Sequence, residues 1–459
     1  MKKKYRILSS NGIDEKLYVN INGQEQYVFI KGMDVNSPIV LNLHGGPANP
    51  DAFFTYEFAK EIIEEFTYVS WDQRGCGRTY YKNKHIDPKN ESTDFGQAIK
   101  DVDELVNYLC KRFKKNKVVI MGHSYGSLLG ASYVVKYPER VEGYIGIGQS
   151  ISIKDTQKIN YNEAVNLLID DKKKIDELEM AYQRLKKSFN LENLMKFQRL
   201  TVPCFVANMP KLKQTNQIKL ILSSPDLAFN DLRWLAGMLN LKAHYIRNKK
   251  LLDYTLSANI YDIGNEYSVP MYFISGEYDK SCHVDLLKKY YDEIVAPNKK
   301  LVIMKACGHS PQIDAPVLFA KEVKKLLQVT KEALYIGIEN AVHGKRLGDI
   351  SFAIQNHCES KSYGVVREFV GHGIGKEMHE EPQVPNYGRR GYGTLLKTGM
   401  CLAIEPMITL GNRKIVLERD GWTVRTSDMK CAAHYEHTVA VRQGKADILS
   451  SFEYIEQVL

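Results

Sequence analysis

The sequence predicts an α/β protein whose mostly parallel sheet is covered by helices on both faces, followed by a second domain of a different kind. Short apolar runs recur from residue 37 onward, nearly continuous in Val, Ile, Leu, Tyr and Phe. Strands buried on both faces have this pattern, which is typical of parallel sheets. An amphipathic stretch at 97–113, with its apolar residues on one helical stripe, lies between two of the runs. The six expected strands are 39–43, 68–71, 118–121, 144–147, 271–274 and 301–304.

The remaining segments complete this architecture. Residues 17–31 alternate with period two and predict an antiparallel hairpin that leads into the sheet. Residues 151–262 interrupt the strand–helix rhythm and look helical, so they predict a cap above the carboxyl ends of the strands. We expect a core of residues 1–150 and 263–328, closed by a helix at 316–328. A partial α+β domain then occupies residues 329–459, with no Gly-, Pro- or Ser-rich linker before it.

Composition narrows the class of protein. The chain of 459 residues is too long for one ordinary core, and no run approaches the roughly 20 apolar residues of a membrane-spanning helix. The basic start, Met1-Lys-Lys-Lys, is not followed by the apolar segment of a signal peptide. Eight dispersed cysteines form no C-x-x-C pair, so we expect reduced thiols and a cytoplasmic location. The net charge of +9 is spread along the chain without a recognisable nucleic-acid-binding module, so no nucleic-acid or membrane partner is expected.

A candidate nucleophile stands directly after the expected strand 118–121. The pentapeptide Gly122-His-Ser-Tyr-Gly126 matches G-x-S-x-G, and an apparent helix at 127–136 follows it. This chemistry needs a sharp strand-to-helix turn that exposes the serine hydroxyl, with glycines two residues away on either side to avoid a clash. Ser124 is therefore predicted to be the nucleophile of an α/β-hydrolase fold, although the same glycines would also suit a turn with a passive serine.

A serine hydroxyl needs a base that is itself oriented by a carboxylate, and in this fold the chain order is Ser, acid, His. Asp279 follows the strand 271–274 and His309 follows the strand 301–304, so both lie at carboxyl ends of strands. We predict Asp279 and His309 as the partners of Ser124. Three rivals stay open on the sequence: the acids Glu277 and Asp285, and the base His283, which opens the next helix.

The reaction also needs N–H donors for the developing oxyanion. One is expected from the backbone of Tyr125, the residue after the nucleophile. The other is expected from the loop His44-Gly-Gly-Pro47; because proline has no N–H, Gly46 is the candidate.

These motifs together resemble the proline iminopeptidase branch of the α/β-hydrolases. The resemblance is carried by His44-Gly-Gly-Pro47, by Trp71-Asp-Gln-Arg-Gly-Cys-Gly-Arg-Thr79 and by Gly122-His-Ser-Tyr-Gly126, and it extends to about residue 328. It implies a serine aminopeptidase that releases N-terminal residues, often proline, from small peptides without a cofactor. Ala48 stands where that family has glycine, and the cap shows no acidic cluster for the substrate amine. An esterase or amidase acting on another small substrate therefore stays open.

A second set of candidate ligands lies in residues 331–449. His372, Glu405 and Glu436 offer one imidazole and two carboxylates, which suit a divalent cation such as Mn, Fe, Co or Zn. The surrounding sequence strongly resembles the second half of a type I methionine aminopeptidase, a pita-bread metallopeptidase with two metal ions. The resemblance implies that His372, Glu405 and Glu436 are metal ligands and that His379 approaches the substrate.

In that family two further ligands, both aspartates, belong to the first half of the fold, and hydrolase sequence stands in its place here. The bridging aspartate holds two cations close enough to share a hydroxide. We therefore expect a remnant that binds one ion weakly and lacks methionine aminopeptidase activity. Two other interpretations stay open: a metal-dependent aminopeptidase completed by a second copy in a homo-oligomer or by the hydrolase, and a scaffold whose pocket is blocked.

Overall fold

The computed structural model describes most of the chain. The described residues are 7, 9–60, 62–169, 171–208, 217–296, 299–360, 363–409, 412–417, 424–427 and 432–450, without the side chains of 241, 324–332 and 433. Cys431 lies outside them. The chain forms two compact units, the first of residues 1–295 and 301–322 and the second of residues 296–300 and 323–459. Within the described residues no helix is long and apolar enough to cross a membrane.

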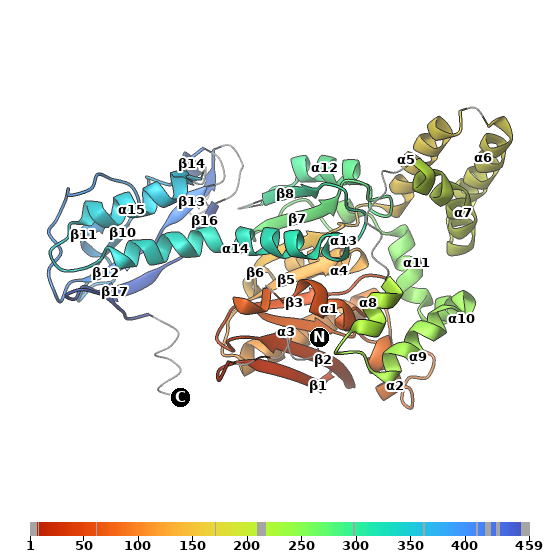
Figure 1. The fold of residues 1–459 in the computed structure, drawn as a ribbon, viewed down its shortest axis with the longest axis horizontal. Coiled ribbons are helices and arrows are strands. Elements are labelled where there is room, and N and C mark those ends of the chain that lie inside the picture. Colours follow the sequence, from red (N-terminus) through yellow and green to blue (C-terminus); the bar gives the residue numbers. More distant parts are fainter. Residues whose placement is uncertain are drawn as a thin grey trace. The chain divides into compact units, whose positions relative to one another are not determined.

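An eight-stranded sheet forms the centre of the first unit (Figure 1). Its strand order is β1-β2-β4-β3-β5-β6-β7-β8. The first two strands form the expected antiparallel hairpin, and the pairs from β4 through β7 are parallel. The strands are β1 (Ile13–Ile21), β2 (Gln24–Gly32), β3 (Ile39–Leu43), β4 (Thr67–Trp71), β5 (Val118–His123), β6 (Val141–Ile147), β7 (Met271–Gly276) and β8 (Lys299–Met304). All six runs expected to be strands are strands, and β3, β4 and β7 are buried along their whole length.

Most of the helices that accompany this sheet lie between its strands in the chain, and α13 and α14 follow its last strand. They are η2 (Ala52–Phe54), α1 (Thr55–Phe58), η3 (Ile62–Glu64), α2 (Gly77–Asn83), α3 (Phe95–Arg112), α4 (Tyr125–Lys136), η4 (Pro138–Arg140), η5 (Ile260–Asp262), α12 (Val284–Glu293), α13 (Pro311–Asp314) and α14 (Pro316–Glu339). Helix α3 begins with Asp94 as its N-cap and buries Val102, Leu105 and Leu109. The closing helix α14 does not end near residue 328, where we expected it to end, because its residues up to Ile336 include no glycine and no proline after Pro316.

The predicted cap is mainly helical in its described residues. It contains α5 (Ile153–Leu167), α6 (Lys172–Lys187), α7 (Leu191–Asn208), α8 (Gln217–Ser223), α9 (Phe229–Met238), α10 (Leu241–Arg247) and α11 (Lys249–Ser257). In Figure 1, α5, α6 and α7 form a group apart from α9 and α10. The first group has its own core, in which Leu178, Phe197 and Phe205 are buried.

In its described residues the second unit contains the part of α14 from residue 323 onward, α15 (Leu347–Ser360) and three small sheets. The strands are β9 (Gly364–Val365), β10 (Gly371–Ile374), β11 (Glu380–Val384), β12 (Cys401–Ile404), β13 (Met407–Thr409), β14 (Ile415–Leu417), β15 (Val424–Thr426), β16 (Ala432–His434), β17 (His437–Ala440) and β18 (Asp447–Ile448). The sheet orders are β11-β10-β12-β17-β18, β16-β13-β9 and β14-β15. Strand β12 pairs with β17 in the first of these sheets. Strand β13, which follows β12, pairs in the second sheet with β16, which precedes β17. The chain therefore passes from one sheet to the other at residues 405–406 and 435–436.

Candidate active site and metal cluster

Ser124 occupies a sharp turn between β5 and α4. Its backbone has φ 53° and ψ −118°, in a region that side chains rarely adopt. A Cβ atom at Gly122 would lie 2.3 Å from the carbonyl oxygen of Gly126, and one at Gly126 would lie 2.0 Å from that of Leu43. The two flanking positions therefore have room only for glycine. This strain and this close packing are the features expected of a nucleophile elbow.

Asp279 and His309 are joined by a hydrogen bond. The Nδ1 atom of His309 lies 2.8 Å from Oδ2 of Asp279, and the other oxygen of Asp279 accepts hydrogen bonds from the backbone N–H groups of Ser281 and Cys282. Burial acts to lower the pKa of His309, but the Asp279 carboxylate outweighs burial and raises it above its ordinary value. Burial acts against the charge of Asp279 as well, yet the pairing with His309 and the two N–H donors lower its pKa. The pair is therefore built to hold an ionised carboxylate beside an imidazole.

Several contacts bring Ser124 to the same place as this pair. Burial raises the pKa of the Cys282 thiol far above its ordinary range, while hydrogen bonds with the side chains of Ser150 and Ser124 act to lower it. Cys282 thus contacts Ser124 through its side chain and Asp279 through its backbone. His123, the residue before Ser124, contacts His309 as well, with Nε2 2.9 Å from the carbonyl oxygen of His309. Burial and the neighbouring His309 lower the pKa of His123 to about 4, so His123 is neutral near pH 7.

The rival residues are engaged elsewhere. Glu277 accepts hydrogen bonds from Lys305 and from the backbone N–H of Ala306. Asp285 accepts a hydrogen bond from Lys288. His283 is buried, caps α12 through Nδ1 and places Nε2 3.1 Å from Glu163 of the cap helix α5. The structure brings Asp279, and not these two acids, to His309.

The two residues that are expected to supply oxyanion donors lie in segments that contact each other. Tyr125 is the first residue of α4, where backbone N–H groups have no acceptor within the helix. A Cβ atom at Gly45 would lie 3.2 Å from Cβ of Ser124, so the loop that carries Gly46 packs against the elbow. Gly46 itself has φ 119°, which an L side chain rarely adopts.

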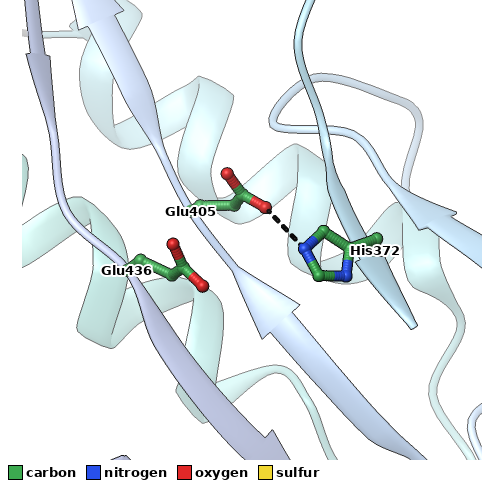
Figure 2. A group of neighbouring side chains, drawn as sticks. All are labelled: His372, Glu405 and Glu436. Atoms are coloured by element: carbon green, nitrogen blue, oxygen red, sulfur yellow. Dashed lines mark ion pairs between the residues drawn. The ribbon is translucent and has the colours of Figure 1, made fainter. Parts of the chain in front are cut away.

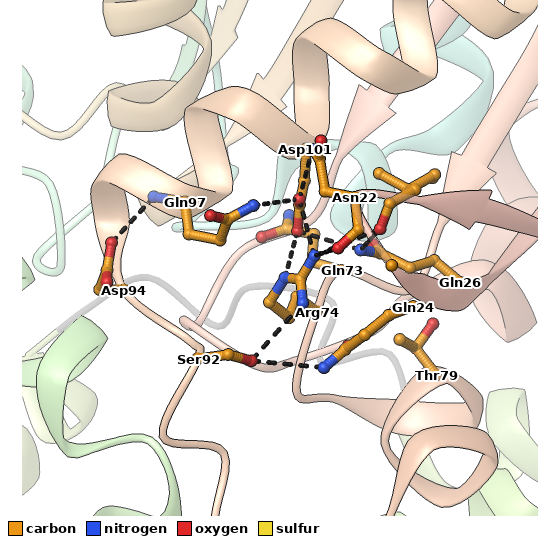
Figure 3. Close-up of polar contacts among 12 residues, drawn as sticks. Asn22, Gln24, Gln26, Gln73, Arg74, Thr79, Ser92, Asp94, Gln97 and Asp101 are labelled. Carbon is orange, nitrogen blue, oxygen red and sulfur yellow. Dashed lines mark hydrogen bonds and ion pairs between the residues drawn. The ribbon is translucent and has the colours of Figure 1, made fainter. Parts of the chain in front are cut away.

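A buried polar network, which sequence reasoning missed, supports this loop (Figure 3). Arg74 donates two hydrogen bonds to Asp101 of α3, at 2.6 and 2.9 Å, and two to carbonyl groups of the lead-in hairpin. The neighbouring Gln73 donates to the carbonyl oxygen of His44 at 3.3 Å. The network thereby ties the hairpin, helix α3 and the loop of Gly46 together. The position of Arg74 within the 71–79 motif was a signal, but nothing in the sequence indicated Asp101 as its partner.

The cap is fastened to the core by similar contacts. Arg78 donates to Asp231 of α9 at 2.8 Å, and both side chains are almost fully buried. Trp234 of the same helix donates to the carbonyl oxygen of Ala48, beside the Gly46 loop. On the other side of the cap, Asn160 of α5 donates to the carbonyl oxygen of Lys280, next to Asp279. Cap helices are thus fixed to both loops that surround Ser124.

His372, Glu405 and Glu436 form a cluster in the second unit (Figure 2). Each of them offers one ligand atom, and these atoms all lie within 4.8 Å of one another. Nδ1 of His372 lies 2.9 Å from the carbonyl oxygen of Gly373, which fixes the proton on Nδ1 and leaves the lone pair on Nε2. That Nε2 atom lies 3.4 Å from Oε1 of Glu405. A free lone pair facing a carboxylate suits a bound cation, so the donor set fits a divalent metal ion.

Two more histidines surround the cluster. The ring of His379 lies 4.1 Å from that of His372, centroid to centroid, so the predicted substrate-contacting residue stands beside the expected ligands. His434 was not predicted: its Nε2 atom lies 3.4 Å from Oε2 of Glu405. Its place two residues before Glu436 was the signal that could have found it.

Comparison with known proteins agrees with the two-part architecture. The family described as alpha/beta hydrolase fold matches residues 38–316, which is more than half of the chain. The chain belongs to the α/β-hydrolase fold family. Metallopeptidase family M24 matches residues 300–443, so this α/β-hydrolase continues into an M24 half domain of the pita-bread type.

Individual relatives match either part. The methionine aminopeptidase of Clostridium acetobutylicum is 50% identical over 160 residues, covering 33% of this chain and 64% of that protein. Methionine aminopeptidase 1 of Bacillus subtilis is 51% identical and covers 28% of this chain and 51% of that protein. The chain therefore spans between half and two thirds of these relatives. Among solved structures, the proline iminopeptidase of Mycobacterium smegmatis covers 68% of this chain and 97% of that chain, at 17% identity and a TM-score of 0.48.

Proposed function

We propose that this α/β-hydrolase is a serine hydrolase that uses Ser124 as nucleophile, His309 as general base and Asp279 as the group that orients His309. The observation that carries the proposal is the hydrogen bond between His309 and Asp279 beside a strained serine. Asp279 fixes the proton of His309 on Nδ1, which leaves the lone pair of Nε2 to accept a proton.

In the proposed reaction, Oγ of Ser124 attacks the substrate carbonyl carbon while Nε2 of His309 takes the hydroxyl proton. The backbone N–H groups of Tyr125 and Gly46 donate to the carbonyl oxygen as it becomes negative. His309 then gives its proton to the leaving nitrogen or oxygen, the bond to the leaving group breaks, and an acyl-enzyme remains. Water, activated by the same imidazole, releases the acid and restores the serine hydroxyl.

For the substrate we propose a small peptide from which the enzyme releases an N-terminal residue, in the manner of a proline iminopeptidase. The proposal is supported by the three motifs at 44–47, 71–79 and 122–126. An esterase or amidase with the same triad is the alternative. In the described part of the cap the acids that contact the core are paired: Asp226 with Lys16, Asp231 with Arg78, and Glu163 with Lys280 and His283.

For the second unit we propose a remnant that holds one divalent ion through His372, Glu405 and Glu436 and has no methionine aminopeptidase activity. The cluster of three ligands supports the proposed ion. The proposed lack of activity is supported by the extent of the resemblance, which covers residues 300–443 and does not include the half that supplies the bridging aspartates in methionine aminopeptidases. A bound ion would act there as a Lewis acid. The alternative, a metal-dependent aminopeptidase completed by a second copy, predicts turnover of a Met-initiated peptide that depends on chain concentration.

We also propose a cytoplasmic location, supported by the seven described cysteines, none of which is in a disulfide. The proposed partner is the small substrate, without a nucleic-acid or membrane partner.

A fluorophosphonate probe and two serine variants test the hydrolase. The wild-type chain should be labelled and should hydrolyse aminoacyl anilides or short esters, and Ser124→Ala should lose both properties. Ser132→Ala is the matched control, because Ser132 lies in α4, the helix that follows Ser124, and its hydroxyl donates to the carbonyl oxygen of Leu128. Added chelator should leave the hydrolysis unchanged. Equal activity of Ser124→Ala and wild type would refute the serine mechanism, and folded protein that takes no label would favour the scaffold interpretation.

A further inference from the structure

The side chain of His123 joins the nucleophile turn to the loop that carries the candidate general base, the base loop of residues 305–310. His123 is the last residue of β5 and directly precedes Ser124. Its Nε2 atom lies 2.9 Å from the carbonyl oxygen of His309, and the two imidazole rings lie 4.9 Å apart, centroid to centroid, at an interplanar angle of 40°. One side chain therefore connects the residue before the nucleophile to the backbone of the base.

This contact fixes which nitrogen of His123 carries the proton. A carbonyl oxygen only accepts hydrogen bonds, so Nε2 is the donor. Burial and the neighbouring His309 lower the pKa of His123 to about 4, so near pH 7 the ring is neutral and its one proton is on Nε2. The unprotonated Nδ1 lies against the loop of Gly46, since a Cβ atom at Gly45 would come within 3.1 Å of it. The ring therefore stands between the base loop and the loop that is expected to supply an oxyanion donor.

Other hydrogen bonds fix the base loop in different directions. The backbone N–H of Gly308 donates to Asp314 of α13 at 2.8 Å. The carbonyl oxygen of Cys307 accepts from the backbone N–H of Tyr278, in the loop of the candidate acid, at 2.9 Å. These two bonds hold the base loop to α13 and to the acid loop, whereas the bond from His123 holds it to the nucleophile turn.

We propose that His123 is a positioning residue of the hydrolase, whose Nε2–H group holds the backbone of His309 so that the imidazole of His309 stays within reach of the Ser124 hydroxyl. The inference rests on the proposed triad. In this role His123 exchanges no proton with the substrate and acts only through His309. The second residue of the G-x-S-x-G pentapeptide thereby has a function of its own, beside the two glycines and the serine.

Two substitutions of His123 separate the hydrogen bond from the bulk of the ring. In His123→Gln the amide nitrogen can reach the place of Nε2 and donate to His309, whereas in His123→Asn the shorter side chain brings its amide nitrogen only to the place of Nδ1. Because a displacement of about 1 Å at a catalytic group costs about 10²-fold in rate, kcat and the rate of fluorophosphonate labelling should fall by about that factor in His123→Asn, with KM little changed. His123→Gln should stay close to wild type. His85→Asn, at an exposed histidine of the same unit, is the control and should equal wild type.

The outcomes separate this role from the triad itself. If His123→Asn is as active as wild type while Ser124→Ala is inactive, the triad stands and the role of His123 is refuted. An equal loss in His123→Asn and His123→Gln would refute it too, because the shape of the ring and not its N–H group would then matter. If His123→Asn does not unfold cooperatively in urea, His123→Gln decides alone, and a folded His123→Gln that is labelled 10²-fold more slowly than wild type would overturn the proposal. If the wild type is neither labelled nor active, the proposed hydrolase fails and the role of His123 fails with it.

Discussion

Nδ1 of His309 lies 2.8 Å from Oδ2 of Asp279, although thirty residues of chain separate the two. The carboxylate is buried and its second oxygen is held by two backbone N–H groups, so it cannot turn away from the imidazole. A base held in this way keeps one tautomer and one orientation, and its pKa is raised by the neighbouring negative charge. Both effects can be measured through the pH dependence of hydrolysis.

Asp279→Asn should lower kcat by about 10³–10⁴-fold, because the amide favours the wrong tautomer of His309. The base acts in its neutral form, so activity is lost as the pH falls through the pKa of His309. Since that pKa is raised, the acid limb of kcat/KM in the wild type should lie above the ordinary imidazole value of about 6.5. In Asp279→Asn the limb should move to lower pH. His283→Gln, which changes the rival imidazole, should leave the limb in place; a shift of the limb in this control would contradict the assignment.

The sequence was sufficient to predict that the candidate residues after strand ends lie together. Asp279 and His309 follow β7 and β8, and parallel strands present their carboxyl ends at one edge of a sheet. Ser124 was recognisable because G-x-S-x-G followed a buried run. The cluster of His372, Glu405 and Glu436 came from a resemblance, since its members lie in short strands with little periodicity.

The contacts that depend on packing between distant segments were not predictable. Arg74 is separated from Asp101 by 27 residues and Arg78 from Asp231 by 153, and any of the 54 acidic residues was a formal candidate for either arginine. His434 was missed although it stands two residues before Glu436, because its contact with Glu405 depends on how the chain crosses between two sheets. The sequence predicted that the cap is helical, but it did not predict which residues attach the cap to the core.

Asp101→Asn should destabilise the first unit by about 3–5 kcal/mol, because it leaves the buried guanidinium of Arg74 without its charge partner. The loop of Gln73 and Gly46 depends on this network, so hydrolysis should fall together with stability. Glu192→Gln is the control, since its ion pair with Lys196 is exposed and should contribute little to stability. Urea unfolding followed by tryptophan fluorescence measures both variants; equal midpoints for the two would show that the buried pair does not support the fold.

Asp72 should make the first unit less stable as the pH rises. It is fully buried, and burial together with the nearby Asp231 raises its pKa to about 7. Because the folded state holds this proton more tightly than the unfolded state, the free energy of unfolding falls between the unfolded pKa of about 3.9 and pH 7. Asp72→Asn removes this dependence, so relative to wild type the variant should gain about 2–3 kcal/mol between pH 5 and pH 8.

Unfolding measured at both pH values gives this difference directly. Asp171→Asn is the control, since it changes an exposed aspartate that caps α6 and asparagine caps equally well. A gain in stability that is the same at pH 5 and pH 8 would contradict the raised pKa of Asp72.

Gly276→Ala should push the loop that carries His309 away from the loop that carries Asp279. Gly276 ends β7, and a Cβ atom there would lie 2.0 Å from the carbonyl oxygen of Gly308 and 2.4 Å from that of Cys307. These are backbone atoms of the loop that carries His309, so the loop must move, and a displacement of about 1 Å at a catalytic group costs about 10²-fold in rate. We therefore expect kcat/KM and the rate of fluorophosphonate labelling to fall by about that factor.

Gly143→Ala is the matched control for this prediction, because Gly143 lies in β6 of the same sheet and its added Cβ atom would come no closer than 3.8 Å to its neighbours. Its kcat/KM should equal that of the wild type. If Gly276→Ala is folded and retains wild-type activity, the close approach of residues 276 and 308 does not set the position of His309. If both variants lose activity equally, the loss comes from a disturbed sheet and not from a displacement of the loop that carries His309.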